Sequence, residues 1–294
     1  MANSLKSAFS TYSSNLEITD RQEGVVSNCR KNVTNTIAKE LTLHPTQSLV
    51  IGSWDRHTLT RYLSEADVDV LVILHYTQNS NWHPASGANA ALAKFKQILE
   101  KKYTSTPMRI DKNCVTMKLT QFRLDVIPAF VFNDGSYRIP DLARGGWIST
   151  NPISFASLIT NVNANMDRTF VPIIKMVKGW NRANGWPIRS IHLETMLYEH
   201  YKNYSQSYTY DSTLKVFFQA LPGYLSLACY EPVTGDRLDS YLDTTATRSR
   251  SSAISKAQRA ATKAVEAYSY QGTNVRKSIE LWKALMGDFF PNYG

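Results

Sequence analysis

Cysteine is scarce in this sequence, and long hydrophobic runs are absent. The 294 residues include 3 cysteines, at positions 29, 114 and 229, and none of them forms a CxxC pair. An odd number of isolated thiols excludes a disulfide framework or a cysteine zinc site and is typical of a reducing compartment. The longest aliphatic run, Val70 to Leu74, is far shorter than the roughly 20 residues that a membrane helix requires.

The composition is that of a globular protein, with 43% hydrophobic and 19% charged residues. The first residues, Met1 to Lys6, lack the apolar core of a secretory signal, so we expect a cytoplasmic protein without a membrane segment. The formal charge of +9 predicts a polyanionic partner. Nucleic acids and nucleoside triphosphates both fit that description, and the charge does not distinguish them.

Hydrophobic spacing predicts an α+β protein with two lobes. Residues 1–150, which include an N-terminal helix, form a mixed-sheet lobe, and residues 151–294 form a mostly helical lobe. We expect the active site in the cleft between the two. The predicted helices span 18–41, 87–102, 152–183, 190–203, 211–221 and 252–286. The predicted strands span 46–51, 67–74 and 113–132, the last as one long strand or two, ending at the Pro128 interruption.

Two aspartates immediately precede the hydrophobic run. Asp67 and Asp69 are two residues apart at the start of a predicted strand, so both side chains point to the same face of the sheet. Two carboxylates this close repel each other unless a cation lies between them, and Mg²⁺ prefers such oxygen ligands. Surface pairs of this kind are also common, so the pair alone predicts little.

A third carboxylate, Asp125, lies among apolar neighbours in the strand-like run 121–127. A neighbouring strand would bring it beside the first two aspartates, and three carboxylates can hold two Mg²⁺ ions about 4 Å apart. Such an ion pair activates an attacking hydroxyl and stabilises a leaving pyrophosphate. The alternative is that Asp125 forms a salt bridge with Arg123 or Arg109.

The predicted strand 46–51 ends at Gly52-Ser53. Glycine permits a tight turn, and the residues after it are expected to open a helix. Backbone N–H groups and the Ser53 hydroxyl would then face an anion such as a triphosphate. With strands on both sides and two carboxylates to follow, the pattern indicates a phosphate-holding turn beside a metal site.

Gly52-Ser53, then Asp67-Val68-Asp69, then Asp125 on a later strand resemble the catalytic motif of the polymerase-β-like nucleotidyltransferase superfamily. The sequence is more similar still to its cGAS/DncV-like branch, the CD-NTases of bacterial CBASS anti-phage signalling. The resemblance runs from about residue 45 to the end. Its supporting segments are 134–141, 147–152, 175–181 and 282–291.

This resemblance implies a template-independent enzyme that joins nucleoside triphosphates into a cyclic di- or trinucleotide second messenger and releases pyrophosphate. It implies that Asp67, Asp69 and Asp125 ligate two Mg²⁺ ions, for which Mn²⁺ can substitute, and that Asp125 acts as the base or orients it. Gly52 and Ser53 would hold the phosphates of the donor nucleotide. A downstream effector, activated by the cyclic nucleotide, would read the signal.

In similar enzymes, a lysine on a later helix and a serine after it grip the triphosphate. The matching positions are Lys178 and Ser190, and Lys175 shares a helix face with Lys178. A triphosphate carries several negative charges, of which Mg²⁺ neutralises only part. The alternatives are a solvated face for the two lysines and helix N-capping for Ser190.

Other polar residues give weaker indications. The histidines lack metal-ligand spacing, and the zinc-binding insertion of animal DNA sensors has no counterpart, which argues against direct activation by DNA. The basic stretch 248–263 is expected to be a solvated helix face rather than a nucleic-acid groove. Gly294 resembles the terminal glycine through which some family members are conjugated to other proteins by ubiquitin-like machinery.

Two rival functions are compatible with the motif. The first is a nucleotidyltransferase that makes linear oligonucleotides or modifies an RNA or small-molecule acceptor. The second is an inactive nucleic-acid-binding relative. Retention of all three aspartates with Gly52-Ser53 argues against the inactive relative, because clustered negative charge is costly to keep.

Overall fold

The computed structural model describes residues 2–206, 208–244 and 248–294. The chain folds into two compact units. One is Ile18–Ala156, and the other combines Met1–Glu17 with Ser157–Gly294. The N-terminal segment therefore groups with the C-terminal part of the chain, whereas the sequence range 1–150 assigns it to the first lobe.

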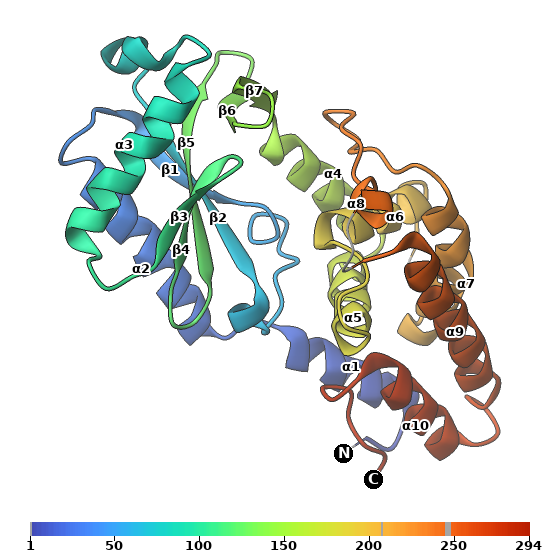
Figure 1. Ribbon diagram of the computed structural model, residues 1–294. Helices are drawn as coiled ribbons and strands as arrows, with labels where there is room; N and C mark the ends of the chain where they lie inside the picture. Colours follow the sequence, from blue (N-terminus) through green and yellow to red (C-terminus); the bar gives the residue numbers. More distant parts are fainter. Residues whose placement is uncertain (1, 207, 245–247) are drawn as a thin grey trace. The chain divides into compact units, whose positions relative to one another are not determined.

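The unit Ile18–Ala156 contains a mixed sheet with the strand order β1-β2-β5-β4-β3, and β6 and β7 extend it from β5 (Figure 1). Strands β2 and β5 are parallel, and the other neighbours are antiparallel. The strands are β1 (Leu43–Ile51), β2 (Asp67–Leu74), β3 (Met108–Asp111), β4 (Cys114–Lys118), β5 (Arg123–Val131), β6 (Tyr137–Asp141) and β7 (Gly146–Thr150).

Helices α2 (Asp20–Ile37) and α3 (Gly87–Lys102) contribute to the main core of this unit, which the sheet completes. Alternation along β2 sends Val68, Val70 and Val72 into that core. The opposite face carries a smaller apolar cluster, and the aspartates extend along the same face. The cluster consists of Leu71, Ile73, Cys114, Ile127, Ala129 and Tyr137. Two short 3-10 helices, η1 (Leu63–Glu65) and η2 (Thr77–Trp82), flank β2.

The second unit, Met1–Glu17 with Ser157–Gly294, consists of helices joined by loops. Two fully buried tryptophans, Trp180 and Trp282, lie in its core. Helix α4 begins in the first unit and ends in the second. The helices are α1 (Leu5–Leu16), α4 (Pro152–Asn165), α5 (Phe170–Ala183), α6 (Ser190–Tyr201), α7 (Tyr210–Ser226), α8 (Tyr241–Thr244), α9 (Arg250–Ser269) and α10 (Val275–Met286). The predicted α+β architecture is confirmed.

Helix α1 packs into the second unit through aromatic side chains. The Phe9 ring lies 5.2 Å from Trp282, edge to face, and the Tyr12 hydroxyl donates to the Met286 carbonyl at 3.1 Å. Tyr12 fits against α5 because Gly179 has no side chain: a Cβ there would lie 2.0 Å from the Tyr12 hydroxyl. These contacts explain why the first 17 residues belong to this unit.

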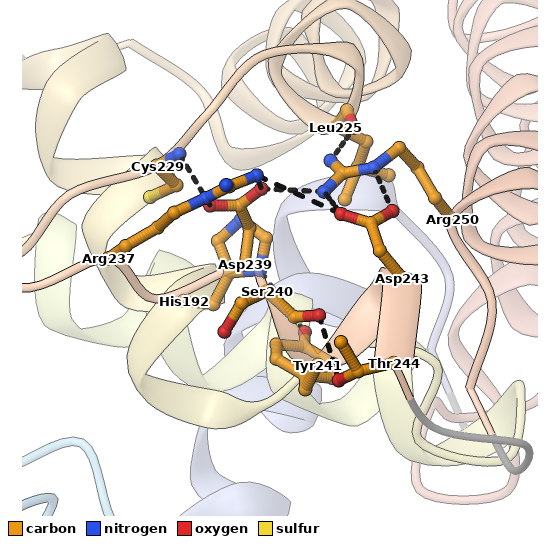
Figure 2. Close-up of polar contacts among 10 residues, drawn as sticks. All are labelled: His192, Leu225, Cys229, Arg237, Asp239, Ser240, Tyr241, Asp243, Thr244 and Arg250. Atoms are coloured by element: carbon orange, nitrogen blue, oxygen red, sulfur yellow. Dashed lines mark hydrogen bonds and ion pairs between the residues drawn. The ribbon is translucent and has the colours of Figure 1, made fainter.

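A buried carboxylate organises the segment before α9 (Figure 2). Asp239 is fully buried and accepts hydrogen bonds from the Cys229 N–H, from Arg237 and from Arg250. Burial favours the neutral acid, but these donors outweigh it and hold the pKa of Asp239 well below its usual range. Arg250 also pairs with Asp243 at 2.7 Å. Arg250, which lies within the predicted basic stretch 248–263, is therefore engaged in ion pairs.

Several predicted boundaries are wrong, each for a local reason. The helix expected over 152–183 is two helices, because Asp167 and Arg168 adopt positive φ values of 49° and 62°. The helix expected over 252–286 is interrupted where the Asn274 side chain caps α10.

A strand and a helix each continue through a proline at which the sequence predicts a break. Strand β5 continues through Pro128, because β4 pairs only with Arg123 to Val126 and needs no N–H from Pro128. Helix α7 continues through Pro222, where Leu221 and Leu225 are fully buried on either side, so packing maintains the helix. No helix in the described part of the chain is long and apolar enough to cross a membrane.

The contact between Gly179 and Tyr12 is a test of how α1 is held. We expect Gly179→Ala to lower the free energy of unfolding by about 1–3 kcal/mol, because the added methyl group collides with a fully buried tyrosine. Gly24→Ala is the matched control, since nothing lies within 4 Å of its Cβ position in α2, and it should be neutral or stabilising by up to about 1 kcal/mol. Urea unfolding measures both, and equal effects of the two substitutions would refute the packing argument.

Candidate active site

The register between β2 and β5 aligns the predicted catalytic carboxylates. Asp69 pairs directly with Asp125, and Asp67 pairs with Arg123 in the adjacent row. Paired residues on neighbouring strands project to the same face, and so do alternate residues along one strand. All three aspartates therefore lie on one face of the sheet, as the sequence predicts.

The carboxylates interact electrostatically. Burial, followed by the charges of Asp125 and Asp67, raises the pKa of Asp69 to about 7. The Asp125 Oδ1 atom is buried without a hydrogen-bond partner. The predicted alternative for Asp125 is wrong, because Arg123 pairs with Asp67 and Arg109 pairs with Asp111. A buried carboxylate oxygen without a donor is an unfavourable arrangement that a bound cation would relieve.

Arg123 determines the present orientation of Asp67. Its guanidinium forms an ion pair with the Asp67 carboxylate, and both side chains are nearly half exposed. Among the described residues, no three His, Cys, Asp or Glu side chains converge closely enough to hold a metal ion as they stand. The donor chemistry of the three carboxylates fits Mg²⁺, provided that Asp67 turns from Arg123 toward Asp69 and Asp125.

Gly52 forms the turn that the sequence predicts. Its φ is +74°, and a Cβ at this position would lie 2.8 Å from the Asp69 Oδ2 atom. The residues after it form a series of turns instead of the expected helix, because the Thr58 and Leu59 amides both donate to the Ser53 carbonyl. The Ser53 and Trp54 N–H groups donate to no acceptor among the described residues. They are therefore available to an anion beside Asp69.

The two predicted lysines lie in the second unit, and neither is solvated. Lys178 is buried and pairs with the fully buried Glu194 on α6 at 2.6 Å, and buried Lys175 pairs with Glu17. The alternative of a solvated helix face is therefore wrong. Glu194 and Glu17 are partners that the sequence did not indicate, since nothing in the spacing of the chain links them to α5.

Ser190 is the first residue of α6 and not its N-cap. The N-cap is Arg189, whose N–H donates to the Tyr241 hydroxyl at 2.8 Å, and His192 Nδ1 lies 3.1 Å from the same oxygen. Burial lowers the pKa of His192 to about 4, so its imidazole is neutral at physiological pH. The capping explanation for Ser190 is therefore wrong, because Ser190 already lies inside the first turn of α6.

Comparison with known protein families identifies the family to which this chain belongs. The model of the Second Messenger Oligonucleotide or Dinucleotide Synthetase domain, SMODS, matches residues 3–163, more than half of the chain. The chain belongs to the SMODS family. The predicted membership of the CD-NTase group is confirmed, and members of this family are nucleotidyltransferases that synthesise second-messenger nucleotides.

Relatives and solved structures agree with this SMODS assignment. The chain is 24% identical to a cyclic AMP-AMP-AMP synthase of an Acinetobacter species, over 87% of this chain and 78% of the relative. The fold matches the cyclic AMP-GMP synthase DncV of Vibrio cholerae with a TM-score of 0.71 at 14% identity, over 95% and 94% of the two chains. It also matches CdnC of E. coli MS115-1, solved in complex with HORMA, with a TM-score of 0.68 at 14% identity, over 97% and 98%.

Because Gly52 lies so close to Asp69, we expect a side chain at position 52 to reduce activity while the protein remains folded. In Gly52→Ala the new methyl group should displace the Asp69 carboxylate and strongly reduce pyrophosphate release from nucleoside triphosphates. Gly135→Ala is the control, since its φ is +79° but nothing lies within 4 Å. Both should lose about 1–2 kcal/mol of stability from the positive φ. Equal turnover in the two variants would contradict the role of the Gly52–Asp69 contact.

Because the ion pair of Lys178 and Glu194 is buried, we expect a large loss of folding stability when only one partner is removed. Lys178→Ala leaves the Glu194 carboxylate buried and should cost about 3–5 kcal/mol in urea unfolding. The double variant Lys178→Met with Glu194→Gln removes both charges and should recover most of that loss. ATP binding is then measured on the stable double variant. Unchanged affinity there would exclude Lys178 from the triphosphate site.

Proposed function

We propose that this SMODS-family chain joins nucleoside triphosphates into a cyclic di- or trinucleotide second messenger and releases pyrophosphate. The observation that carries the proposal is the register of β2 and β5, which sets Asp69 opposite Asp125 next to the Gly52 turn. The match to a cyclic AMP-AMP-AMP synthase supports ATP as one substrate. The neighbour DncV, solved with ATP and GTP, supports a site that accepts two nucleotides.

The cofactor in this proposal is a pair of Mg²⁺ ions held by Asp67, Asp69 and Asp125, with Mn²⁺ as a substitute. The unpartnered Asp125 Oδ1 atom and the raised pKa of Asp69 support a cation at this position. When bound, the ions supply charge neutralisation and activation of the attacking hydroxyl. The ion pair between Arg123 and Asp67 must open for the third carboxylate to join the other two.

The residues of the chain then act on the two nucleotides. The Ser53 hydroxyl and the free N–H groups of the Gly52 turn bind the donor triphosphate. The oxygen of the acceptor hydroxyl attacks the α-phosphorus of the donor, and Asp125 accepts the proton that this hydroxyl loses. A P–O bond to the acceptor forms while the bond to pyrophosphate breaks.

The proposal also includes three residues of the second unit. Lys175, Lys178 and Ser190 bind the triphosphate tail, and the two lysines exchange carboxylate partners for phosphate when they do so. That exchange keeps each buried ammonium group paired in both states. Without such an exchange, the two lysines would have a structural role alone, as the ion-pair partners that α5 offers to Glu17 and Glu194.

The biological setting completes the proposal. We infer a cytoplasmic enzyme of CBASS anti-phage defence whose product activates a downstream effector. Conjugation through Gly294 would require the tail to detach, because Tyr293 is bridged to Ala2 and the Gly294 N–H donates to the Ala2 carbonyl. The complex of CdnC with HORMA makes a HORMA protein a reasonable partner to test first.

Product analysis tests the function directly. The protein is incubated with Mg²⁺ or Mn²⁺ and labelled ATP, GTP, CTP and UTP, treated with phosphatase, and its products are identified by mass. A phosphatase-resistant cyclic product is expected. A ladder of linear products would replace the cyclase proposal with a linear synthase, and no pyrophosphate release, with and without a HORMA partner, would refute both.

The aspartates are tested in the same assay. We expect the double change Asp67→Ala with Asp69→Ala to reduce turnover to background while the folded state persists, because loss of clustered like charge does not open the core. Asp134→Ala is the matched control, since that carboxylate is exposed and accepts hydrogen bonds from Ser136 in a turn away from the three aspartates. Turnover that survives the double change would remove the metal assignment, and circular dichroism checks the fold.

A further inference from the structure

A groove of about 620 Å³ lies within the helical unit, between α9, α10 and the end of α5 (Figure 1). Its lining includes three cationic side chains of α9, those of Lys256, Arg259 and Lys263, and one acidic side chain, that of Glu266. The volume is in the range of pockets that hold a small molecule. The excess of positive charge indicates an anionic ligand.

The three cations follow one face of α9. They occupy positions i, i+3 and i+7 of the helix, and residues at this spacing are neighbours on its surface. The seven residues from Lys256 to Lys263 cover about 10 Å along the helix axis. The cations therefore form one short row along the groove.

Two of these cations have no partner among the described residues. The side chains of Arg259 and Lys263 form no hydrogen bond or ion pair there, and Glu266 is not paired with Lys263. Like charges four residues apart destabilise a helix, so the row is an unfavourable arrangement that an anion would relieve. The Lys256 ammonium group differs, because it donates to the carbonyl of Asn184, the C-cap of α5, at 2.6 Å.

The row is limited at both ends. Glu266 lies three residues beyond Lys263 and would repel an anion that continued in that direction. In the other direction, the next cation of α9 is Arg250, which is engaged with Asp239 and Asp243. A ligand of this row therefore carries its charge over a short length, unlike a nucleic-acid strand, whose phosphates continue at regular intervals.

The neutral part of the lining adds polar groups but no stacking surface. Ser255 and Gln258 contribute a hydroxyl and an amide beside the cations. The one aromatic side chain among the described lining residues, Trp180, is fully buried, so it offers no ring face to a nucleotide base. Recognition in this groove therefore depends on charge and hydrogen bonding.

We propose that this groove binds a short chain of phosphates, and that Arg259 and Lys263 hold it. Guanidinium and ammonium groups form charge-assisted hydrogen bonds with phosphate oxygens, and a guanidinium does so in bidentate geometry. The chain is either an inorganic oligophosphate or the 5′ end of a nucleotide whose base the groove does not contact. Lys175, Lys178 and Ser190 do not line the groove, so the site is separate from the triphosphate site proposed above.

Lysine footprinting tests the site on the unmodified protein. The protein is acetylated with an amine-reactive reagent, with and without inorganic triphosphate, and the labelled peptides are quantified by mass spectrometry. Labelling of Lys263 should fall several-fold as triphosphate saturates. Labelling of Lys6, an exposed lysine of α1 without a partner among the described residues, should stay the same. Equal labelling of Lys263 with and without triphosphate would overturn the proposal, and so would equal protection by sulfate at the same ionic strength.

Further arms of the footprint identify the source of the phosphates. Protection of Lys263 by α,β-methylene-ATP at lower concentration than by inorganic triphosphate would support a nucleotide, and the reverse order would support an inorganic oligophosphate. Adenosine, which carries no phosphate, should not protect Lys263. Protection by poly-glutamate but not by triphosphate would mean that the groove takes an acidic protein segment, and the proposal would be wrong.

The variant Arg259→Gln tests the guanidinium. The triphosphate concentration that half-protects Lys263 should rise about tenfold or more, because a charge-assisted contact is lost. Arg21→Gln removes the same charge from α2 in the other unit and should leave that concentration unchanged. Both arginines are exposed and without a partner among the described residues, so both variants should fold. An equal rise in the two variants would show an effect of net charge alone and overturn the proposal, whether or not the protein releases pyrophosphate.

Discussion

The parallel pairing of β2 with β5 is the constraint on which the candidate site depends. Its register sets Asp69 against Asp125, and a shift by one residue would turn one of the two carboxylates to the helix-covered face. The hydrophobic residues next to the aspartates in sequence maintain that register, because Val68, Val70 and Val126 must stay in the core formed with α2 and α3. Burial on one face thus fixes the positions of the charges on the other.

Much of this arrangement can be read from the sequence. Strand β2 and helix α3 have the bounds that hydrophobic spacing predicts, since both elements have a strong periodic pattern. The common face of the three aspartates follows from alternation along each strand together with adjacency of the two strands. The positive φ of Gly52 follows from a glycine placed at the end of a strand.

What the sequence could not supply is the set of partners that are distant along the chain. Glu194 and Glu17 lie outside the helix that carries the lysines they pair with, and no local pattern connects them. Tyr241 binds Arg189, the N-cap of α6, from a segment about fifty residues away in sequence, and no local pattern distinguishes that residue from Ser190 as the cap. The same limit applies to α7, where packing around Pro222 outweighs the local preference for a helix end.

The assignment of α1 to the C-terminal helices has a consequence for the order of folding during synthesis. Residues 18–156 form their own sheet and core, so this unit can fold while the rest of the chain is still being made. Phe9 and Tyr12 have to wait for Gly179, Trp282 and Met286, which are made later. Helix α1 therefore leaves the ribosome well before the residues that bury it, and it cannot take its place until α10 has been made.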